Sequence, residues 1–452
     1  MSSDTKPVWV WLPDSKDPVL AGTFEVRQNS GGVVGYFSYD SGYLKYDRAF
    51  SLDPRKLKFS QTHPNKQYKS RLKGGLFGVF RDVCPEGYGR DLLNFRYGTF
   101  DGPLNEMDLL ERSMGDSVGA IEICDDIEAK LAASSPPGSD ILISALSSLS
   151  AERKASHAIH QIYDIGTSMG GERPKLTIEK GGELWLAKLQ DRGDAPHMPA
   201  REMVAMRLAT ACGLTVSEVE LFRSQNKHEA LFVKRFDRVG VSGQRIPYMS
   251  AQTVLGLDIG ILRGDPGRSY IVLADNARRI GVPDEDIREL WRRMAFNALI
   301  NNVDDHPKNH GFIRIGETWS LSPAFDIVPL LTLQPDVGPV LAMSVSKDGK
   351  QQAGIEQLIM SAPFFGLNVA ESADWLLESA QTIHERWLPD MLEAGVNKEF
   401  CQTRQYLSFQ FAASIVNKPD LIDQSLKAAE NASTRRRRRS ARSPASDRRP
   451  KP

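Results

Sequence analysis

The chain has 452 residues, and its 57 basic and 57 acidic side chains give a formal net charge of zero. Apolar residues make up 41% and charged residues 25%, which is typical of a globular protein of two or three domains and excludes collagen, a fully disordered chain and a small disulfide scaffold. No apolar run is long enough to span a membrane, and the N-terminus lacks the pattern of a secretory signal. The four cysteines are scattered and form no CxxC pair. We therefore expect a reducing, cytoplasmic setting without disulfides or a zinc site.

The first part of the chain is predicted to be rich in short strands. Between residues 7 and 50, runs of β-branched and aromatic residues alternate with Gly, Asp and Asn, and a mixed segment follows at 70–125. The stretch 126–158 is rich in Ser and Ala and contains the sequence SPPG, which is typical of a linker. We therefore expect an N-terminal β-rich module over residues 1–125 and a linker over 126–158.

A second group of strands is predicted within residues 159–240. Strands at 175–179 and 183–190 flank a Gly-Gly turn, and a helical pattern at 199–212 ends at Gly213. The segment ALFVKRFDR then reads as a further strand.

The remaining chain is predicted to be a helical lobe over 241–432, followed by a disordered basic tail over 433–452. Apolar residues repeat at three and four residue steps from 287 to 299, and helical patterns recur at 370–395 and 400–430. The tail carries nine basic residues from Arg435 onward against Asp447 alone, in a low-complexity Arg/Ser/Pro sequence. Such a tail could contact a polyanion or be phosphorylated itself, although a solvated tail is the simpler interpretation.

The segment NNVDDHPKNHGFIRIGETWSLSPAFDI carries the strongest chemical signal. Asp304 and Asn309 lie five residues apart in a Pro-containing loop, and Asp326 follows a predicted strand pair. Phosphoryl transfer from ATP uses this set of groups, because one carboxylate receives the proton of the attacking hydroxyl while an amide oxygen and a second carboxylate hold magnesium. Protein kinases place the same three groups in the same order.

Features upstream of this segment are consistent with a nucleotide site. Lys188 lies in the apolar strand ELWLAKL, where an ammonium group needs an anion or access to water. Gly170 and Gly171 lie in a turn that could expose backbone N–H groups to phosphate. Glu202 lies early in the next predicted helix, where it could pair with the strand lysine, and VKRF at 233–236 stands where a hinge would meet adenine.

Each feature alone also has a structural explanation. The loop could be a solvated Asx turn, the lysine could reach water along an edge strand, and the glycines could form an ordinary hairpin turn. The helix glutamate could interact with the helix dipole, and VKRF could be the end of a core strand. The combined order of the features is far more specific than any one of them and favours a phosphotransferase.

These segments together resemble the HipA family of bacterial serine/threonine kinases, which are the toxin halves of toxin–antitoxin pairs. The resemblance covers roughly residues 8–430. It is carried by the blocks SMGGERPK, WLAK, REMVAMRLATACGL, ALFVKRFDR, NNVDDHPKNHGF and LSPAFDIVPLL, of which DDHPKN and PAFDI are the most specific. The segment CPEGYGRDLL at 84–93 resembles the family's Leu-Pro-Asp block, with CPE in place of LPD, and Asp305 stands where the family often has Gly.

The resemblance implies a role for each matching residue. Asp304 would be the catalytic base, Asn309 and Asp326 would bind Mg²⁺, and Lys188 would contact the ATP phosphates. Ser168 matches a serine whose autophosphorylation ejects the phosphate loop and disables the enzyme. The implied nucleotide-binding residues are Gly170, Gly171, Glu172, Arg173, Pro174, Lys175, Lys234, Arg235, Phe236, His306, Pro307, Lys308 and Phe325. A zinc site at His306 and His310 is disfavoured, because Pro307 lies between them and no HExxH motif is present.

The sequence thus predicts an α+β, two-lobed protein kinase-like fold and transfer of the γ-phosphoryl group of ATP to a protein Ser or Thr. The resemblance implies a HipB-like antitoxin, contact with DNA only through that antitoxin, no membrane partner, and a substrate in translation such as glutamyl-tRNA synthetase. Three alternatives stay open: a small-molecule or lipid kinase, an AMP transferase on the same frame, and a non-catalytic co-repressor subunit.

Overall fold

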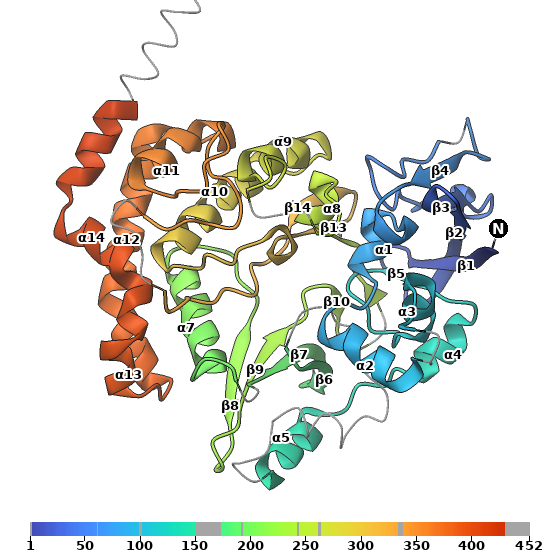
Figure 1. Ribbon diagram of the computed structural model, residues 1–452, viewed down its shortest axis with the longest axis horizontal. Coiled ribbons are helices and arrows are strands. Elements are labelled where there is room, and N and C mark those ends of the chain that lie inside the picture. Colours follow the sequence, from blue (N-terminus) through green and yellow to red (C-terminus); the bar gives the residue numbers. More distant parts are fainter. Residues whose placement is uncertain are drawn as a thin grey trace, which may run out of the picture.

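The computed structural model describes residues 2–60, 62–98, 102–149, 173–190, 193–241, 244–260, 264–332 and 338–429. The described residues form an N-terminal sheet with its helices, a second sheet and a helical lobe, and these three parts lie around a common centre (Figure 1). Within the described ranges, no helix has both the length and the apolar character needed to cross a lipid bilayer.

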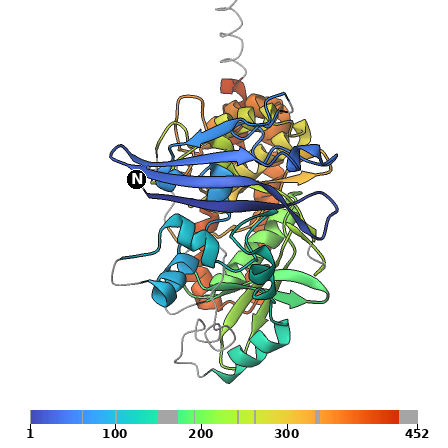
Figure 2. The same ribbon diagram turned by 90° about the vertical axis from the view of Figure 1, so that its right-hand side faces the viewer.

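The N-terminal module is built on a five-stranded antiparallel sheet, which lies in front when the molecule is turned by 90° (Figure 2). Its strands, in spatial order, are β4 (Gln67–Ser70), β3 (Gly32–Tyr39), β2 (Pro18–Asn29), β1 (Ser2–Trp11) and β5 (Ile121–Ile123). Phe24 of β2 and its cross-strand partner Phe37 of β3 are fully buried, and Phe80 of a short helix packs against both rings. The helical elements of the module are η1 (Tyr43–Lys45), η2 (Lys73–Gly75), α1 (Gly78–Asp82), α2 (Tyr88–Tyr97), α3 (Glu106–Arg112) and α4 (Ile127–Ala132).

The second sheet is four-stranded and antiparallel, in the order β6 (Lys175–Lys180), β7 (Glu183–Leu189), β9 (Glu229–Lys234) and β8 (Val219–Arg223). Its two faces carry different helices. Ala230 and Phe232 pack with α5 (Ser139–Ser148) on one face, and the alternate residues Leu231 and Val233 belong to the main core with α7 (Met198–Ala211) on the other.

The segment that the sequence predicted as a linker therefore contains two helices within residues 126–149. Leu142 and Leu146 of α5 are fully buried against β6 and β7. Their spacing of four residues puts both on one helix face, and this apolar face outweighs the Ser-rich composition that suggested a linker.

The C-terminal lobe is mainly helical, as predicted. Its long helix α10 buries Leu290, Trp291 and Met294 in the core that also contains the N-terminal sheet. A three-stranded sheet, β12-β13-β14, lies between this lobe and the module. The elements are β10 (Arg238–Val239), β11 (Gln244–Arg245), β12 (Tyr248–Ser250), α8 (Ala251–Leu255), α9 (Tyr270–Arg279), α10 (Asp284–Leu299), η3 (Pro307–Asn309), β13 (Gly311–Ile315), β14 (Thr318–Leu321), α11 (Ile355–Ser361), η4 (Ala362–Phe365), α12 (Val369–Glu393), α13 (Lys398–Thr403), η5 (Gln405–Phe409) and α14 (Gln410–Asn417).

Candidate functional site

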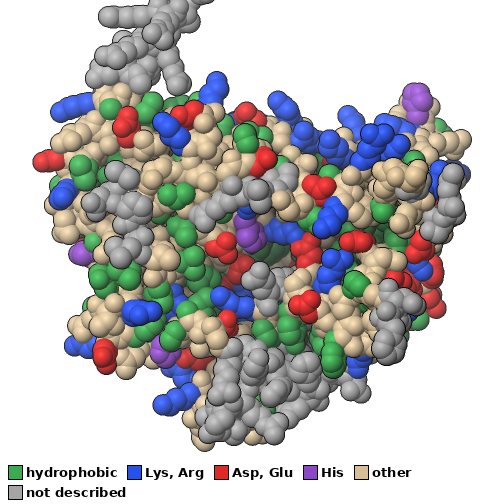
Figure 3. Space-filling view, viewed as in Figure 1, with side chains coloured by type: hydrophobic (Ala, Val, Ile, Leu, Met, Phe, Trp, Pro, Cys, Tyr) green, Lys and Arg blue, Asp and Glu red, His purple; other side chains and the backbone are tan. Residues whose placement is uncertain are grey.

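A cleft of about 630 Å³, here called the central cleft, opens where the second sheet, the helical lobe and the N-terminal module meet. Acidic, basic and histidine side chains gather around a hollow in the middle of one face of the molecule (Figure 3). Predicted site residues that line the cleft are Arg173, Lys175, Lys188, Glu202, Lys234, Arg235, Phe236, Asp304, His306, Lys308, Asn309, Phe325 and Asp326.

Lys188 is the polar centre of the cleft. It lies on β7, and its Nζ donates to Glu202 Oε1 of α7 at 2.5 Å and to Asp326 Oδ1 at 2.8 Å. Glu202 is buried, whereas the Asp326 side chain is 41% exposed and faces the cleft. A strand lysine paired with a helix glutamate is the arrangement that an active protein kinase uses to hold ATP phosphates.

The charges in this group shift the pKa of each member. Burial alone would lower the pKa of Lys188, but the carboxylates of Asp326 and Glu202 raise it above its ordinary value. The ammonium of Lys188 in turn holds the pKa of Asp326 well below its ordinary value, and burial raises the pKa of Glu202. Lys175 lies opposite Lys188 in the β6–β7 ladder, and its burial lowers its pKa to about 8. Two lysines side by side on one sheet make this part of the cleft suitable for phosphate.

The loop between α10 and β13 carries Asp304 and Asn309, as the sequence predicted for a turn at a helix end. Asp304 is exposed to the cleft, and its backbone carbonyl accepts from the His306 N–H at 2.7 Å and from Asn309 Nδ2 at 3.4 Å. The neighbouring Asp305 points inward, where its carboxylate contacts His310 Nε2 at 2.9 Å, and both side chains are buried. His306 lines the cleft, whereas His310 is buried beside Asp305.

Asp326 is placed by backbone contacts that precede it. Ala324 forms a parallel bridge with Val216, with its N–H donating to Thr215 O at 2.8 Å and its carbonyl accepting from Ser217 N–H at 3.0 Å. Asp326 itself has a φ of +58°, a strained value for a residue other than glycine. Such strain persists where the surroundings fix the backbone, and it is common at functional sites.

The donors of Asn309 and Asp326 fit a magnesium ion. Both side chains offer oxygen, the ligand atom that Mg²⁺ prefers, and the bond from Asn309 Nδ2 to Asp304 leaves the amide oxygen as the atom available to a cation. In the part of the chain that the structure describes, no group of three or more His, Cys, Asp or Glu side chains could hold a metal. A magnesium ion here would therefore need phosphate and water oxygens to complete its coordination, as is usual for this metal.

The predicted hinge residues are less available to a nucleotide than the sequence suggests. The N–H groups of Lys234 and Arg235 donate to Glu218 O and Leu184 O, each at 2.9 Å. The Arg235 side chain is buried and turned away, donating to Asp237, to Thr177 and to the carbonyls of residues 116 and 117. Phe236 also lines the cleft, and its ring centroid lies 5.5 Å from that of Phe325.

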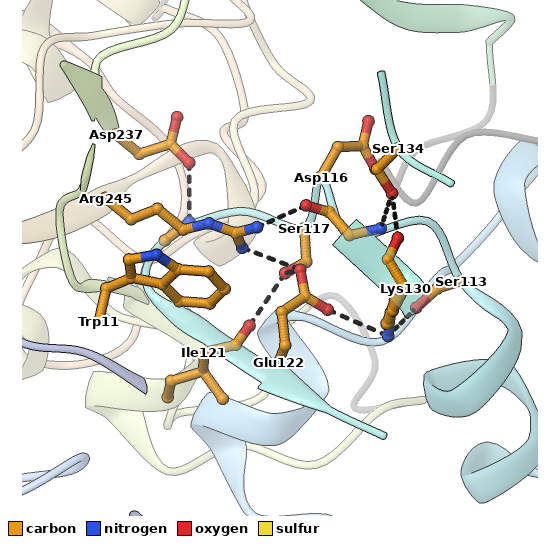
Figure 4. A network of polar contacts seen from close by, with 12 residues as sticks. Trp11, Ser113, Asp116, Ser117, Ile121, Glu122, Lys130, Ser134, Asp237 and Arg245 are labelled. Carbon is orange, nitrogen blue, oxygen red and sulfur yellow. Dashed lines mark hydrogen bonds and ion pairs between the residues drawn. The ribbon is translucent and has the colours of Figure 1, made fainter. Parts of the chain in front are cut away.

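The contacts of Arg235 are part of a buried polar network between the N-terminal module and the residues after the hinge. Glu122 of β5 lies between Lys130 at 3.0 Å and Arg245 at 2.9 Å, and the Arg245 guanidinium stacks over Trp11 (Figure 4). Asp237 accepts from the Gly119 N–H at 2.7 Å. The module is therefore fixed to the strand end that enters the cleft.

The remaining predicted residues are in part outside the described ranges. Ser168, Gly170, Gly171 and Glu172 are outside the described residues, as is the basic tail. Arg173 pairs with Asp194 at 3.4 Å, and the Pro174 carbonyl accepts from Leu189 N–H. Pro307 is buried at the start of η3, and its ring does not line the cleft.

Sequence reasoning missed the contribution of the N-terminal module. Asp82, Cys84 and Glu86 line the same cleft, and Glu86 forms an ion pair with Lys308. The segment CPEGYGRDLL was noted as a family block, but more than 200 residues separate it from the loop that it meets. No local pattern reveals a contact of that separation.

Comparisons with known proteins place this geometry in a family. The model of the HipA N-terminal domain matches residues 14–124, and the model of the HipA-like C-terminal domain matches residues 167–387. Y4mE of Sinorhizobium fredii, which is named as a kinase, is 25% identical over 356 residues, covering 70% of this chain and 79% of that protein. The serine/threonine-protein kinase toxin HipA of Shewanella oneidensis is 26% identical over 207 residues, covering 40% of this chain and 47% of that protein.

A solved structure confirms the predicted α+β, two-lobed fold. The complex of HipA, HipB and operator DNA from Shewanella oneidensis MR-1 contains a chain that matches with a TM-score of 0.65. The match has 18% sequence identity and covers 93% of this chain and 99% of the other. It establishes the fold, which is the kinase-like fold expected from the sequence.

Proposed function

The chain belongs to the HipA family of kinases, and we propose that it transfers the γ-phosphoryl group of ATP to a serine or threonine of a protein. The observation that carries the proposal is the convergence of Lys188, Asp304, Asn309 and Asp326 on one cleft, from three separate segments of the chain. This set supplies the charges and the proton acceptor that phosphoryl transfer uses.

Each residue has a distinct proposed role. Asp304, exposed in the cleft and without an ion pair to any residue that the structure describes, would receive the proton of the attacking hydroxyl. Asn309 and Asp326 would hold Mg²⁺, which when bound neutralises charge on the phosphates. Lys188 would contact the phosphates while Glu202 fixes its position. The aromatic rings of Phe236 and Phe325 would pack against adenine at the far end.

The direct test is a transfer assay with γ-labelled ATP and magnesium, comparing wild type with Asp304→Asn. We expect label on protein Ser or Thr in the wild type, and a loss of at least about 100-fold in the variant with ATP affinity largely kept, because the general base acts only in the chemical step. Label on lipid or metabolites, or α-label on protein, would contradict the proposal and point to the other phosphotransfer classes. Mass mapping of the label also tests autophosphorylation at Ser168.

We also propose that the chain is a growth-inhibiting toxin with a HipB-like, DNA-binding antitoxin as its partner. The support is the resemblance of the fold to the HipA chain of a complex with HipB and operator DNA. Induced expression should slow bacterial growth with wild type and not with Asp304→Asn. Equal growth inhibition by both proteins would reject a toxic effect that depends on phosphoryl transfer.

A further inference from the structure

The segment between α1 and α2 brings an acidic side chain of the N-terminal module into the central cleft. Glu86 forms an ion pair with Lys308, and both residues line the cleft. Lys308 stands directly before Asn309 in the loop that also carries Asp304. The module therefore contacts the loop on which the proposed chemistry depends.

Contacts on the N-terminal side fix this segment firmly to the helical lobe. At the end of α1, the Asp82 carboxylate accepts from Ser250 N–H at 2.8 Å, from Ser250 Oγ at 2.6 Å and from Thr253 Oγ1 at 2.9 Å. One residue earlier, Arg81 pairs with Asp258 at 3.0 Å. These bonds cross from the module to β12, α8 and the loop after it, so the chain enters the cleft from a defined point.

The segment is also constrained after Glu86. Gly87 has φ 51° and ψ −125°, a combination that is essentially limited to glycine, and it directly precedes α2. The turn at Gly87 lets the chain leave the cleft at once and begin the helix. Glu86 thus lies at the tip of a short excursion that is fixed on both sides.

The simplest alternative is a surface ion pair with no role beyond modest stabilisation. The Lys308 and Glu86 side chains are 32% and 30% exposed, and pairs so accessible to water contribute little to stability. The pair does, however, restrict one of the most flexible side chains, because lysine has four rotatable bonds and a compact charge. Holding the Lys308 ammonium in one position favours binding of a phosphate group that must lie at a fixed place in the cleft.

We infer that Glu86 is a positioning residue, which holds the Lys308 ammonium in the cleft for the terminal phosphate of a bound nucleoside triphosphate. The inference rests on the proposed function for the identity of the ligand. It assigns the N-terminal module a part in the active site: the module sets the orientation of the Lys308 ammonium, on the loop between α10 and β13, without itself touching the phosphate.

The test compares nucleotide affinities, so it does not depend on turnover. Isothermal titration with magnesium measures the affinity of the full-length protein for a non-hydrolysable ATP analogue and for ADP. We expect Glu86→Gln and Lys308→Met each to reduce the preference for the triphosphate by about fivefold to tenfold, as loss of one charge-assisted contact does. The double variant should lose no more than Lys308→Met alone, because Glu86 acts through Lys308. Glu86→Asp should restore part of the preference.

Glu25→Gln is the matched control, because Glu25 pairs with Arg27 on the same module away from the cleft. An unchanged preference in Glu86→Gln, or additive losses in the double variant, would overturn the inference. If the preference depends on Glu86 but wild type transfers no phosphoryl group, the positioning role stands and the kinase proposal fails. If wild type transfers phosphate and Glu86→Gln keeps the full preference, only the positioning role fails. Binding of neither nucleotide would reject both.

Discussion

At the scale of single residues, the central cleft is organised around one lysine shared by two acids. Lys188 donates to Glu202, which is buried, and to Asp326, which is half open to the cleft. Glu202 is too buried to contact a substrate, so its role is to fix the position of Lys188, whereas Asp326 remains accessible to a cation. The Lys188 ammonium thus links helix α7, through Glu202, to the cleft, through Asp326.

Replacing Lys188 with Ala should impair both binding and stability. Nucleotide affinity and transfer rate should fall together, and the free energy of unfolding should drop by about 2–4 kcal/mol, because Glu202 is left buried without a counter-charge. Urea unfolding and nucleotide titration measure the two effects. Adding Glu202→Gln should recover part of the stability and none of the activity. A Lys188→Ala protein with wild-type transfer would exclude a phosphate-binding role.

Asp82 should make the stability depend on pH. Burial raises its pKa to about 6 in the folded protein, whereas an unfolded chain has a value near 4. The folded state therefore holds the proton more tightly, so the stability that Asp82 contributes is full below about pH 4 and decreases as the pH rises to about 6. Relative to Asp82→Asn, wild type should lose about 2–3 kcal/mol between these values. Thermal unfolding of both proteins at pH 4.5, 5.5 and 7 checks this. The same dependence of stability on pH in wild type and in Asp82→Asn would contradict it.

At the scale of elements, α5 shows where packing overrides composition. Leu146 is fully buried against the second sheet, and Ile141 on the same helix is 49% exposed. We expect Leu146→Ala to lower the free energy of unfolding by about 2–4 kcal/mol and Ile141→Ala by less than about 0.5 kcal/mol. Chemical denaturation measures both. Equal effects of the two changes would mean that α5 does not pack as described.

The elements also show what a sequence can and cannot predict. The strand of Lys188 and the helix of Glu202 were predictable from local signals, the Gly-Gly turn before the strand and Gly213 after the helix, and β7 and α7 begin and end within two residues of the predicted bounds. The contact between Glu86 and Lys308 depends on how the module folds back over the lobe, which no local pattern contains. The buried course of Arg235 was missed for the same reason, since its partners other than the neighbouring Asp237 come from residues 116, 117 and 177, which are distant in the sequence.

At the scale of the whole molecule, the N-terminal module and the lobes share one interior. A single apolar cluster runs from Val8 and Phe24 of the first sheet to Leu290 of α10. Beside it, Glu122 of β5 lies between Lys130 and Arg245 (Figure 4). Burial alone would raise the pKa of Glu122, but these two cations lower it to about 2. The carboxylate therefore stays charged at neutral pH and connects the module to the segment after the hinge.

Replacing Glu122 with Gln should test whether the molecule unfolds as one unit. The change keeps the shape but leaves two buried cations without a counter-charge, so we expect a loss of about 3–5 kcal/mol. Glu111 pairs with Lys6 in the same module and is more exposed than Glu122. Glu111→Gln should therefore lower the free energy of unfolding by less than about 1 kcal/mol. Because the core is continuous, calorimetry should show one transition that shifts as a whole in Glu122→Gln. Two transitions, with only the first shifted, would mean that the N-terminal module unfolds independently of the rest of the chain.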